Sequence, residues 1–420
     1  VVAQRDSRSR CAVIHTVLAR RRHRQCARCD VGGGSGRGVE GVVAHEYFHN
    51  WLPNKMNLKT PKGQYEFQRE WFSEGFTEYF SRVFLYEMDL LTPDEFVETF
   101  NADIVSIKNN PSAVHSYAAI VELAVNNQLN SGLSIIGDGE QTRQHFVTTF
   151  IEHLSGVDFK NKKTVRIRDR YDAKVPVVID NIFREKSVFV EDAKYLRSLT
   201  NLPIKYTLPG PMTMVDTLYD DYYKSRKKLA EKFAEVLNKE AKELADAGVN
   251  YIQFDEPAFN VFFDEVKDWG ISILEKAASN LKAKTIVHIC YGYGIEANIN
   301  WKNSLGEEWR QYENVFPLLK KSKIDQVSLE CQNSRVPMNL IELLRGKKIL
   351  VGAIDVASKK VETPEQVADI LREATKYAEP QNILGCTNCG MVTFSQEIAN
   401  AKMQALALGA KILNQELGFE

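Results

Sequence analysis

Short apolar runs alternate with long amphipathic stretches through the larger, C-terminal part of the chain. Buried strands are predicted at 133–138, 203–208, 249–254, 284–290, 324–330, 347–355 and 382–386. Apolar residues at helical spacing predict helices between them, for example over 221–247, 363–379 and 395–416. Because strands that alternate with helices of this length form parallel sheets, we expect an α/β fold.

Almost every expected strand ends in a polar or glycine-rich cluster. These clusters include Gly137-Asp138-Gly139-Glu140, Asp255-Glu256-Pro257, Cys290-Tyr291-Gly292, Glu330-Cys331-Gln332 and Cys386-Thr387-Asn388-Cys389-Gly390. Chemistry at the carboxyl ends of many strands is typical of a TIM (β/α)8 barrel. A doubly wound sheet would instead concentrate it at one switch point. The sequence therefore predicts a TIM-type barrel, although the pattern supplies seven strands rather than eight.

The chain before this barrel follows a different pattern. Residues 1–40 form an arginine- and glycine-rich irregular segment, and residues 41–111 have the spacing of helices. One predicted helix carries His45 and His49 on one face with Glu46 beside them. This is the H-E-x-x-H arrangement, in which two imidazoles bind zinc and the glutamate activates a water. A second helix, around residues 71–80, would supply Glu74 as a third ligand. We therefore expect three parts, with the barrel spanning residues 112–420.

Composition excludes several classes of protein. The 420-residue chain is 44% hydrophobic and 26% charged, with a formal net charge of -1, so nothing points to nucleic acid or an anionic membrane. No apolar run approaches the roughly 18 residues needed to span a bilayer. Seven cysteines in a chain of this length do not suggest a disulfide framework. We expect a cytoplasmic protein without membrane or nucleic-acid partners.

Four side chains at three strand ends form a candidate zinc site. His288 and Cys290 point to the same face of one strand, because residues i and i+2 do so. Glu330 and Cys389 end two other strands, although Cys386 competes with Cys389 as a ligand. Two thiolates, a carboxylate and an imidazole make a zinc site with net negative charge, which favours a substrate thiolate at neutral pH. The hard carboxylate of Glu330 is the ligand most easily exchanged for sulfur.

The motifs at these strand ends carry a family resemblance. The motifs are Asp138-Gly139-Glu140-Gln141, Gln253-Phe254-Asp255-Glu256-Pro257-Ala258, His288-Ile289-Cys290-Tyr291-Gly292, Ser328-Leu329-Glu330 and Asn388-Cys389-Gly390. In this order they resemble the catalytic barrel of the cobalamin-independent methionine synthases, most of all the short "core" type. The resemblance implies a zinc-dependent methyltransferase of methionine biosynthesis that acts on homocysteine. It implies zinc ligation by His288, Cys290, Glu330 and Cys389, and binding of the homocysteine amino group by Glu140 and Asp255.

Three departures from the family pattern concern the methyl donor and the barrel itself. Thr217 stands where the long enzymes have a folate-stacking tryptophan, and Ala357 stands where they have a proton-donating histidine. Both changes favour a corrinoid or another non-folate carrier over methyl-folate as the methyl donor. The family's first strand has no counterpart here, so we expect a barrel that lacks it. Methyl or alkyl transfer to another thiol, such as coenzyme M, is an alternative within the same class.

The N-terminal motifs carry a second resemblance. His45-Glu46-Tyr47-Phe48-His49-Asn50-Trp51 and Trp71-Phe72-Ser73-Glu74-Gly75-Phe76-Thr77-Glu78-Tyr79-Phe80 resemble the gluzincin metallopeptidases of the glycyl aminopeptidase type. The alternative function is therefore a zinc aminopeptidase that uses His45, Glu46, His49 and Glu74. The strand that aligns a peptide in those enzymes has no counterpart, which favours an inactive helical fragment. A third hypothesis is a defective fusion whose barrel binds zinc but turns over little. The sequence leaves open the methyl donor, the origin of the fusion and the oligomeric state.

Overall fold

The computed structural model describes residues 79–88, 90–98, 111–293 and 295–419. The chain divides into two compact units, Val1–Val114 and His115–Glu420. In the first unit, the described residues are helical at 79–87 and 93–98. The predicted peptidase-like site lies outside the described residues, and its metal binding stays a prediction. That site comprises His45, Glu46, His49 and Glu74.

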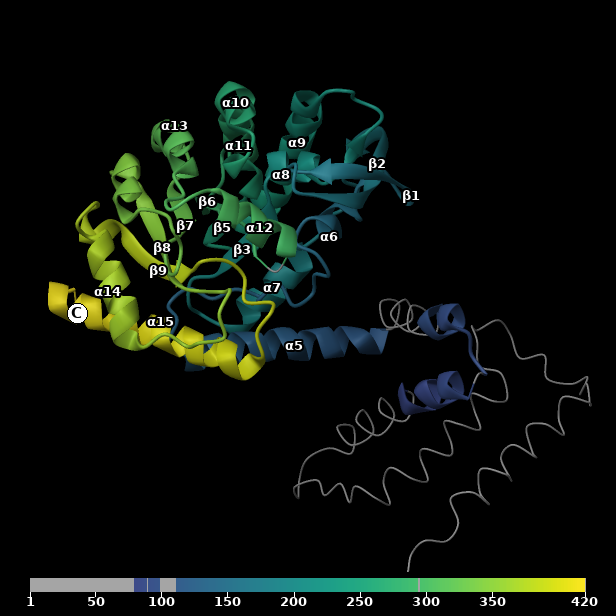
Figure 1. The fold of residues 1–420 in the computed structure, drawn as a ribbon, viewed down its shortest axis with the longest axis horizontal. Helices are drawn as coiled ribbons and strands as arrows, with labels where there is room; N and C mark the ends of the chain where they lie inside the picture. The colour runs from purple at the N-terminus through teal and green to yellow at the C-terminus, as the bar shows by residue number, and fades with distance from the viewer. Residues whose placement is uncertain (1–78, 89, 99–110, 294, 420) are drawn as a thin grey trace, which may run out of the picture. The chain divides into compact units, whose positions relative to one another are not determined.

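A six-stranded parallel sheet forms the centre of the second unit, with the order β3-β5-β6-β7-β8-β9. The strands are β3 (Lys205–Pro209), β5 (Tyr251–Asp255), β6 (Lys284–Ile289), β7 (Gln326–Glu330), β8 (Lys348–Ile354) and β9 (Ile383–Thr387). Figure 1 shows these strands side by side, with the connecting helices outside the row. Each predicted strand from 203–208 onward is confirmed to within a few residues. The α/β architecture with a parallel sheet is the one that the sequence predicts.

The segment before β3 extends the sheet by a single bridge. Ile136 pairs with Ile204 in parallel, and the Ile136 N–H donates to the Pro203 carbonyl at 3.0 Å. The strand predicted at 133–138 is therefore too long. The chain leaves the sheet at once because Gly139 and Glu140 adopt left-handed backbone angles, with φ of 66° and 54°. At the other end, the described residues contain no strand bonded to the outer edge of β9. This is the arrangement expected of a TIM-type barrel without its first strand.

Helices connect and flank these strands, and one of them shows how a side chain fixes where a helix begins. They are α5 (Pro111–Asn130), α6 (Thr148–Ile151), α7 (Val190–Leu199), α8 (Pro211–Asp216), α9 (Arg226–Asp246), α10 (Phe263–Glu265), α11 (Ile271–Ala277), α12 (Glu296–Ser304), α13 (Phe316–Lys321), α14 (Pro364–Ala374) and α15 (Gln396–Leu417). The helix predicted from residue 221 begins only at Arg226. Ser225 caps it by accepting from the Lys228 N–H, and Asp220 holds the preceding turn by accepting from the Tyr223 and Ser225 N–H groups.

A long antiparallel hairpin is the main element that the sequence analysis did not predict. β1 (Ser155–Ile167) pairs with β2 (Tyr171–Phe183), and β4 (Tyr219–Asp220) joins β2 in a separate three-stranded sheet. Much of β1 is exposed and lysine-rich, so it carries no apolar run for a pattern search to find. Its turn, 168–170, places Arg168 and Asp169 in the left-handed region, with φ of 49° and 55°.

The hydrophobic core of the second unit lies between the sheet and its helices. Large side chains such as Tyr206, Phe233, Phe254, Tyr312 and Phe316 are fully buried there. Burying such aromatic side chains contributes about 2–3 kcal/mol each. This packing fixes the strands, and the strands fix the positions of the groups at their ends. In the part of the chain that the structure describes, no helix has the length and apolar character to span a bilayer.

Candidate functional site

The strand register places the predicted site residues next to one another at one end of the sheet. Asp255 is opposite His288 on the neighbouring strand, and His288 is opposite Ser328. Glu330 is opposite Gly352 on the next strand. Parallel strands bring their carboxyl ends to the same edge, so residues distant in the sequence meet there.

Three of the four predicted zinc ligands form one cluster. The ligand atoms of His288, Cys290 and Cys389 all lie within 4.8 Å of one another. The sulfur atoms of Cys290 and Cys389 are 3.8 Å apart. Glu330 ends β7 and is completely buried, but its carboxylate is outside this group of three. The structure therefore gathers a nitrogen and two sulfur donors, with a buried carboxylate on the adjacent strand.

Several polar atoms of this cluster lack partners within the described part of the chain. His288 Nδ1 lies 2.9 Å from Ser328 Oγ, whereas the buried His288 Nε2 has no hydrogen-bond partner. Both carboxylate oxygens of Glu330 are also buried without a partner. Buried polar groups are nearly always hydrogen-bonded, so such orphans call for an explanation, and a bound ion is one. The donor set of imidazole, two thiols and carboxylate fits zinc.

The electrostatics of the cluster favour a thiolate. A hydrogen bond from Cys389 and the nearby His288 hold the pKa of Cys290 well below its usual range, against the effect of burial. Burial, together with the charge of Cys290, raises the pKa of Glu330 to about 7. Lys302 and Tyr293 oppose this shift. A cation at this position would stabilise both the thiolate and the carboxylate.

The other two cysteines near these strand ends are less suited to bind the ion. Cys386 Sγ lies 3.7 Å from Ser328 Oγ. Burial raises the pKa of its thiol to about 11, but the hydrogen bond with Cys290 and burial also raise the pKa of Cys389, so the pKa does not separate these two cysteines. Cys331 is buried, which also raises the pKa of its thiol. Neither belongs to the cluster of potential ligands found among the described residues. The geometry therefore favours Cys389 over Cys386.

Two carboxylates lie beside the cluster. Asp255 ends β5, and its Oδ1 accepts from Gln253 Nε2 at 2.8 Å. Glu140 is half-buried in the left-handed turn after Ile136. Burial raises the pKa of both carboxyl groups, and the charge of Asp255 adds to the shift at Glu140. Carboxyl groups whose pKa is raised by burial are suited to a cation such as a primary ammonium group, which would favour their ionised form.

Arg143 supports Glu140, one of these two carboxylates, and the sequence analysis did not identify it. Its side chain is 1% exposed, with Nη2 3.2 Å from Asp138 and Nη1 3.8 Å from Glu140. Its guanidinium carbon packs against the rings of both Phe189 and Tyr206, at 4.5 and 4.7 Å from their centroids. The available signal was the i, i+3 spacing from Glu140.

Asn388 holds the loop that carries Cys389. Its Oδ1 accepts from the Cys331 N–H at 3.1 Å, and its Nδ2 donates to the Gln332 carbonyl at 2.8 Å. Gly352 is required beside it, because a Cβ there would lie 2.3 Å from Asn388 Oδ1. The motif Asn388-Cys389-Gly390 contained this residue, but only its cysteine has a chemistry that a sequence pattern reveals.

Glu256 fixes the turn after β3 in a similar way. Its buried carboxylate accepts from the N–H groups of Met212 and Thr213, both at 2.9 Å, and from the Thr213 hydroxyl at 2.7 Å. A Cβ on Gly210 would lie 2.2 Å from this carboxylate, so only glycine fits. Thr217 follows at the end of α8, where its hydroxyl donates to the Met214 carbonyl.

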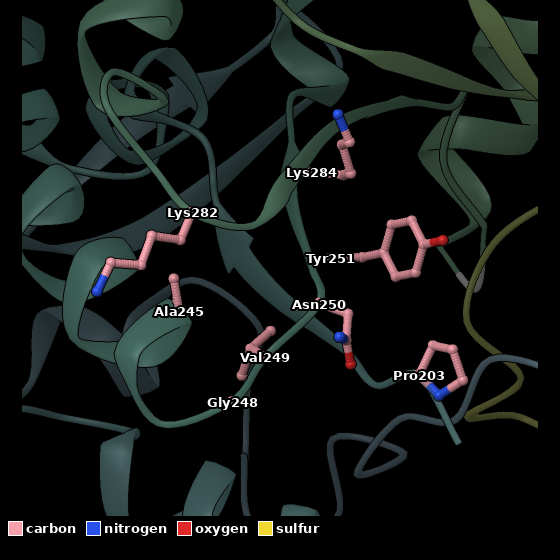
Figure 2. Close-up of a pocket in the computed structure, with 8 residues that line it drawn as sticks. All are labelled: Pro203, Ala245, Gly248, Val249, Asn250, Tyr251, Lys282 and Lys284. Carbon is pink, nitrogen blue, oxygen red and sulfur yellow. The ribbon is translucent and has the colours of Figure 1, made fainter. Parts of the chain in front are cut away.

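A surface hollow lies at the opposite end of the strands. It is lined by Pro203, Ala245, Gly248, Val249, Asn250, Tyr251, Lys282 and Lys284. Figure 2 shows the amino groups of Lys282 and Lys284 pointing away from each other. Lys282 is paired with Asp246 at 2.6 Å. Because no reactive groups converge there, the strand ends around His288 are the better candidate site.

Two known families match different parts of the chain. A family described as "Cobalamin-independent synthase, Catalytic domain" matches residues 102–411. A family described as "M61 glycyl aminopeptidase" matches residues 39–131. The first match covers the whole candidate site, and the second covers His45, Glu46, His49 and Glu74. Both agree with the resemblances that the motifs carry.

Individual relatives point to the same family as the first match. A methionine synthase of Sulfurisphaera tokodaii is 32% identical over 289 residues, which are 68% of this chain and 79% of that protein. The structure of a B12-independent methionine synthase from Shewanella sp. W3-18-1, in complex with selenomethionine, is 60% identical, with a TM-score of 0.72. The alignment covers 74% of this chain and 91% of that one. A Listeria monocytogenes structure, 22% identical with a TM-score of 0.54 over 70% of this chain and 86% of that one, supports the fold alone.

Proposed function

Since this chain belongs to the family of cobalamin-independent methionine synthases through residues 102–411, we propose that it methylates the sulfur of homocysteine to form methionine. The observation that carries the proposal is the cluster of His288, Cys290 and Cys389 at the strand ends. A buried imidazole and two thiols within 4.8 Å are suited to a metal that binds sulfur. The family provides the reaction, and the cluster provides the chemistry that a thiol substrate needs.

The metal that this donor set fits is zinc, held by His288, Cys290 and Cys389 together with Glu330. Zinc at such a site lowers the pKa of a thiol and so supplies a nucleophilic sulfur at neutral pH. Ser328 fixes the imidazole of His288 through Nδ1, which leaves Nε2 for the metal. The position of the Glu330 carboxylate, outside the group of three, suits a ligand that exchanges with the substrate.

Glu140 and Asp255 bind the α-ammonium group of homocysteine in this proposal. Both carboxyl groups lie beside the metal cluster, and a bound ammonium would restore their normal ionisation. Arg143 and Gln253 hold the two side chains in place. The Shewanella relative was solved with selenomethionine, an amino acid with the same ammonium group, which supports this assignment.

The methyl donor follows from the family rather than from the site. The comparisons give no support to the corrinoid carrier that Thr217 and Ala357 suggested, since the matching family is described as cobalamin-independent. We therefore infer a methyl group carried on a reduced folate. The sulfur forms a bond to the methyl carbon while the bond from that carbon to the folate nitrogen breaks. The nitrogen takes up one proton, which balances the proton lost by the thiol.

The test is a methyl-transfer assay on the zinc-loaded full chain. We expect L-homocysteine and 5-methyltetrahydrofolate to give methionine, and Cys389→Ser to abolish its formation. Cys331→Ser is the matched control, because Cys331 is buried nearby but lies outside the cluster. Parallel assays with methylcobalamin decide the donor. Methionine from methylcobalamin alone would contradict the folate donor, and none from either donor would contradict the proposed function.

The match of residues 39–131 to the glycyl aminopeptidases favours a second candidate function. In that function, His45, His49 and Glu74 bind zinc and Glu46 activates a water. The barrel would then play no part in the reaction. The two functions use different residues of the same chain, so substitutions in each segment separate them in activity assays.

A further inference from the structure

The turn of the β1–β2 hairpin reaches the end of the sheet that carries the candidate site. Arg168 Nε lies 2.7 Å from Asp216 Oδ2, at the end of α8. Arg170 Nη1 donates to Asn298 Oδ1 at 3.0 Å and to the Tyr291 carbonyl at 3.4 Å. The turn therefore connects the segment after β3 with the segment after β6. Tyr291 follows directly on the proposed metal ligand Cys290.

The guanidinium of Arg170 is held firmly by groups that carry no charge. Its Cζ is 3.3 Å from the centroid of the Trp301 ring, which in turn stacks on Tyr291 with centroids 5.7 Å apart. Its hydrogen-bond acceptors are an amide and a backbone carbonyl. Its buried Nε has no partner among the described residues. Rigid neutral contacts of this kind orient a guanidinium without neutralising it.

Arg170 also lacks an acidic partner in the described part of the chain, since no carboxylate oxygen there lies within 4.0 Å of it. Asp216, whose charge acts on Arg170, is paired with Arg168. Burial and the charge of Arg168 lower the pKa of Arg170 to about 10. The buried Arg143 and Arg184, by contrast, each pair with a carboxylate. A largely buried charge without a counter-ion is costly, so a negative partner is missing here.

We propose that Arg170 binds a carboxylate of a reactant at the catalytic site. A guanidinium matches a carboxylate with two parallel hydrogen bonds, and the face of Trp301 holds its plane. The identity of the reactants rests on the proposed function. Homocysteine carries an α-carboxylate next to the ammonium group that Glu140 and Asp255 attract, and a folate carries the carboxylates of its glutamate.

Calorimetric binding to the full chain tests the homocysteine source without any turnover. The two ligands are L-methionine and 3-(methylthio)propylamine, which lacks only the carboxylate. In Arg170→Met we expect the affinity for methionine to fall by about 10- to 100-fold, as when a hydrogen-bonded ion pair loses one partner. The affinity for the amine should stay unchanged. Arg166→Met is the matched control, because Arg166 lies on the same hairpin in an exposed pair with Asp172.

The folate source is tested in the same way, with 5-methyltetrahydrofolate against 5-methyltetrahydropterin, which has no glutamate. In one outcome, Arg170→Met loses the preference for the ligand with a glutamate while it keeps the preference for methionine over the amine. That result assigns the carboxylate bound by Arg170 to the methyl donor. If Arg170→Met fails to fold, Arg170→Lys keeps the charge but loses the paired hydrogen bonds, and should weaken binding of the carboxylate ligand only. Unchanged affinities in both arms would overturn the proposal. A wild-type protein that binds methionine but makes none would contradict the proposed function and leave the test of Arg170 intact.

Discussion

At the scale of single residues, the site combines fully paired side chains with a few that have no partner. Ser328 and Asn388 satisfy the groups that orient the ligands. His288 Nε2 and the Glu330 carboxylate are buried without a hydrogen bond among the described residues. Each such atom is destabilising by about 1–3 kcal/mol unless a partner binds. A metal ion is the partner that would satisfy both at once.

The zinc content of the protein should therefore depend on the C-terminal cluster. We expect about one zinc per chain, as in four-ligand protein sites. The double variant Cys290→Ser with Cys389→Ser should abolish it, because both sulfur donors are removed. Cys386→Ser and His45→Ala should retain most of the metal. The measurement is mass spectrometry of the dialysed protein, and zinc that persists in the double variant would refute the ligand assignment.

Arg143 should be important for folding as well as for the position of Glu140. Arg143→Met leaves Asp138 and Glu140 without their buried counter-charge, which we expect to lower the free energy of unfolding by about 3–5 kcal/mol. Urea denaturation followed by circular dichroism measures this change. Lys282→Met removes a solvent-exposed pair with Asp246 and should have little effect. Equal effects of the two substitutions would contradict the role given to Arg143.

Glu256 should make stability depend on pH in the neutral range. Burial raises its pKa from 4.5 to about 7, so ionisation is suppressed in the folded protein. The protonated Glu256 side chain stabilises the fold fully below pH 4.5, and this stabilisation is lost as the pH rises through about 7. Relative to Glu256→Gln, wild-type stability should fall by about 3 kcal/mol between these limits, at roughly 1.4 kcal/mol per pKa unit.

The control for this pH dependence is Glu416→Gln. A hydrogen bond from Arg372 lowers the pKa of Glu416, so its titration is complete before the neutral range begins. The free energy of unfolding, measured from denaturation curves at several pH values, should then change with pH equally in wild type and Glu416→Gln. An equal pH dependence of stability in wild type and Glu256→Gln would show that the Glu256 carboxyl group does not cause it.

The sequence identified the ligands better than the residues that position them. His288 and Cys290 could be predicted because the i, i+2 rule for strands needs no knowledge of the fold. Arg143 and Ser328 could not, because their partners depend on the register between strands and on side-chain packing. Arg170 gave no signal at all, since it belongs to a hairpin that the hydrophobic pattern did not reveal.

At the scale of elements, burial separates the correct predictions from the missed ones. β7 is buried along its whole length, and an apolar run predicted it to within two residues. The exposed β1 lacks such a run, and its lysines resemble those of a surface loop. The helix expected over 363–379 ends at Ala374, five residues early, before a short 3-10 segment that begins at Pro380. Pairing and capping depend on contacts that a periodicity does not encode.

The contact between α14 and α15 allows a direct test of close packing. A Cβ on Gly409 of α15 would lie 2.5 Å from Val367 Cβ and 2.6 Å from the Pro364 carbonyl of α14. Gly409→Ala should lower stability by about 1–3 kcal/mol through overpacking. Because one of these approaches is to backbone, we expect the upper part of this range, which exceeds the roughly 1 kcal/mol that alanine gains in helix propensity. The exposed Leu408→Ala serves as the control in thermal melts, and a more stable Gly409→Ala would contradict the close approach.

At the scale of the whole molecule, different segments of the chain match two families with different chemistry. The match to the aminopeptidases covers residues 39–131, and the match to the methionine synthases covers residues 102–411. The chain divides into compact units at Val114, within the overlap of the two matches. The described residues of the second unit have a hydrophobic core of their own, which is a property of domains that can fold alone. We therefore expect the two segments to be functionally independent.

Substitutions in one segment should leave the activity of the other unchanged. Glu46→Gln should retain full methyl transfer, because Glu46 belongs to the peptidase-like segment, whereas Cys389→Ser should lose it. Neither the wild type nor Glu46→Gln should release glycine or alanine from N-terminal aminoacyl substrates. Hydrolysis by the wild type that disappears in Glu46→Gln would make the aminopeptidase the better-supported function.

The 3.8 Å spacing of the Cys290 and Cys389 sulfur atoms has a consequence for the life of the protein under oxidative stress. Two thiols this close can be joined by peroxide, which accepts the two electrons and leaves as water. A metal ion that occupies both sulfur atoms shields them from this attack, whereas metal-free protein is exposed to it. Oxidants would thus first inactivate the protein molecules that have lost their metal. A dithiol reductant followed by zinc would restore these molecules.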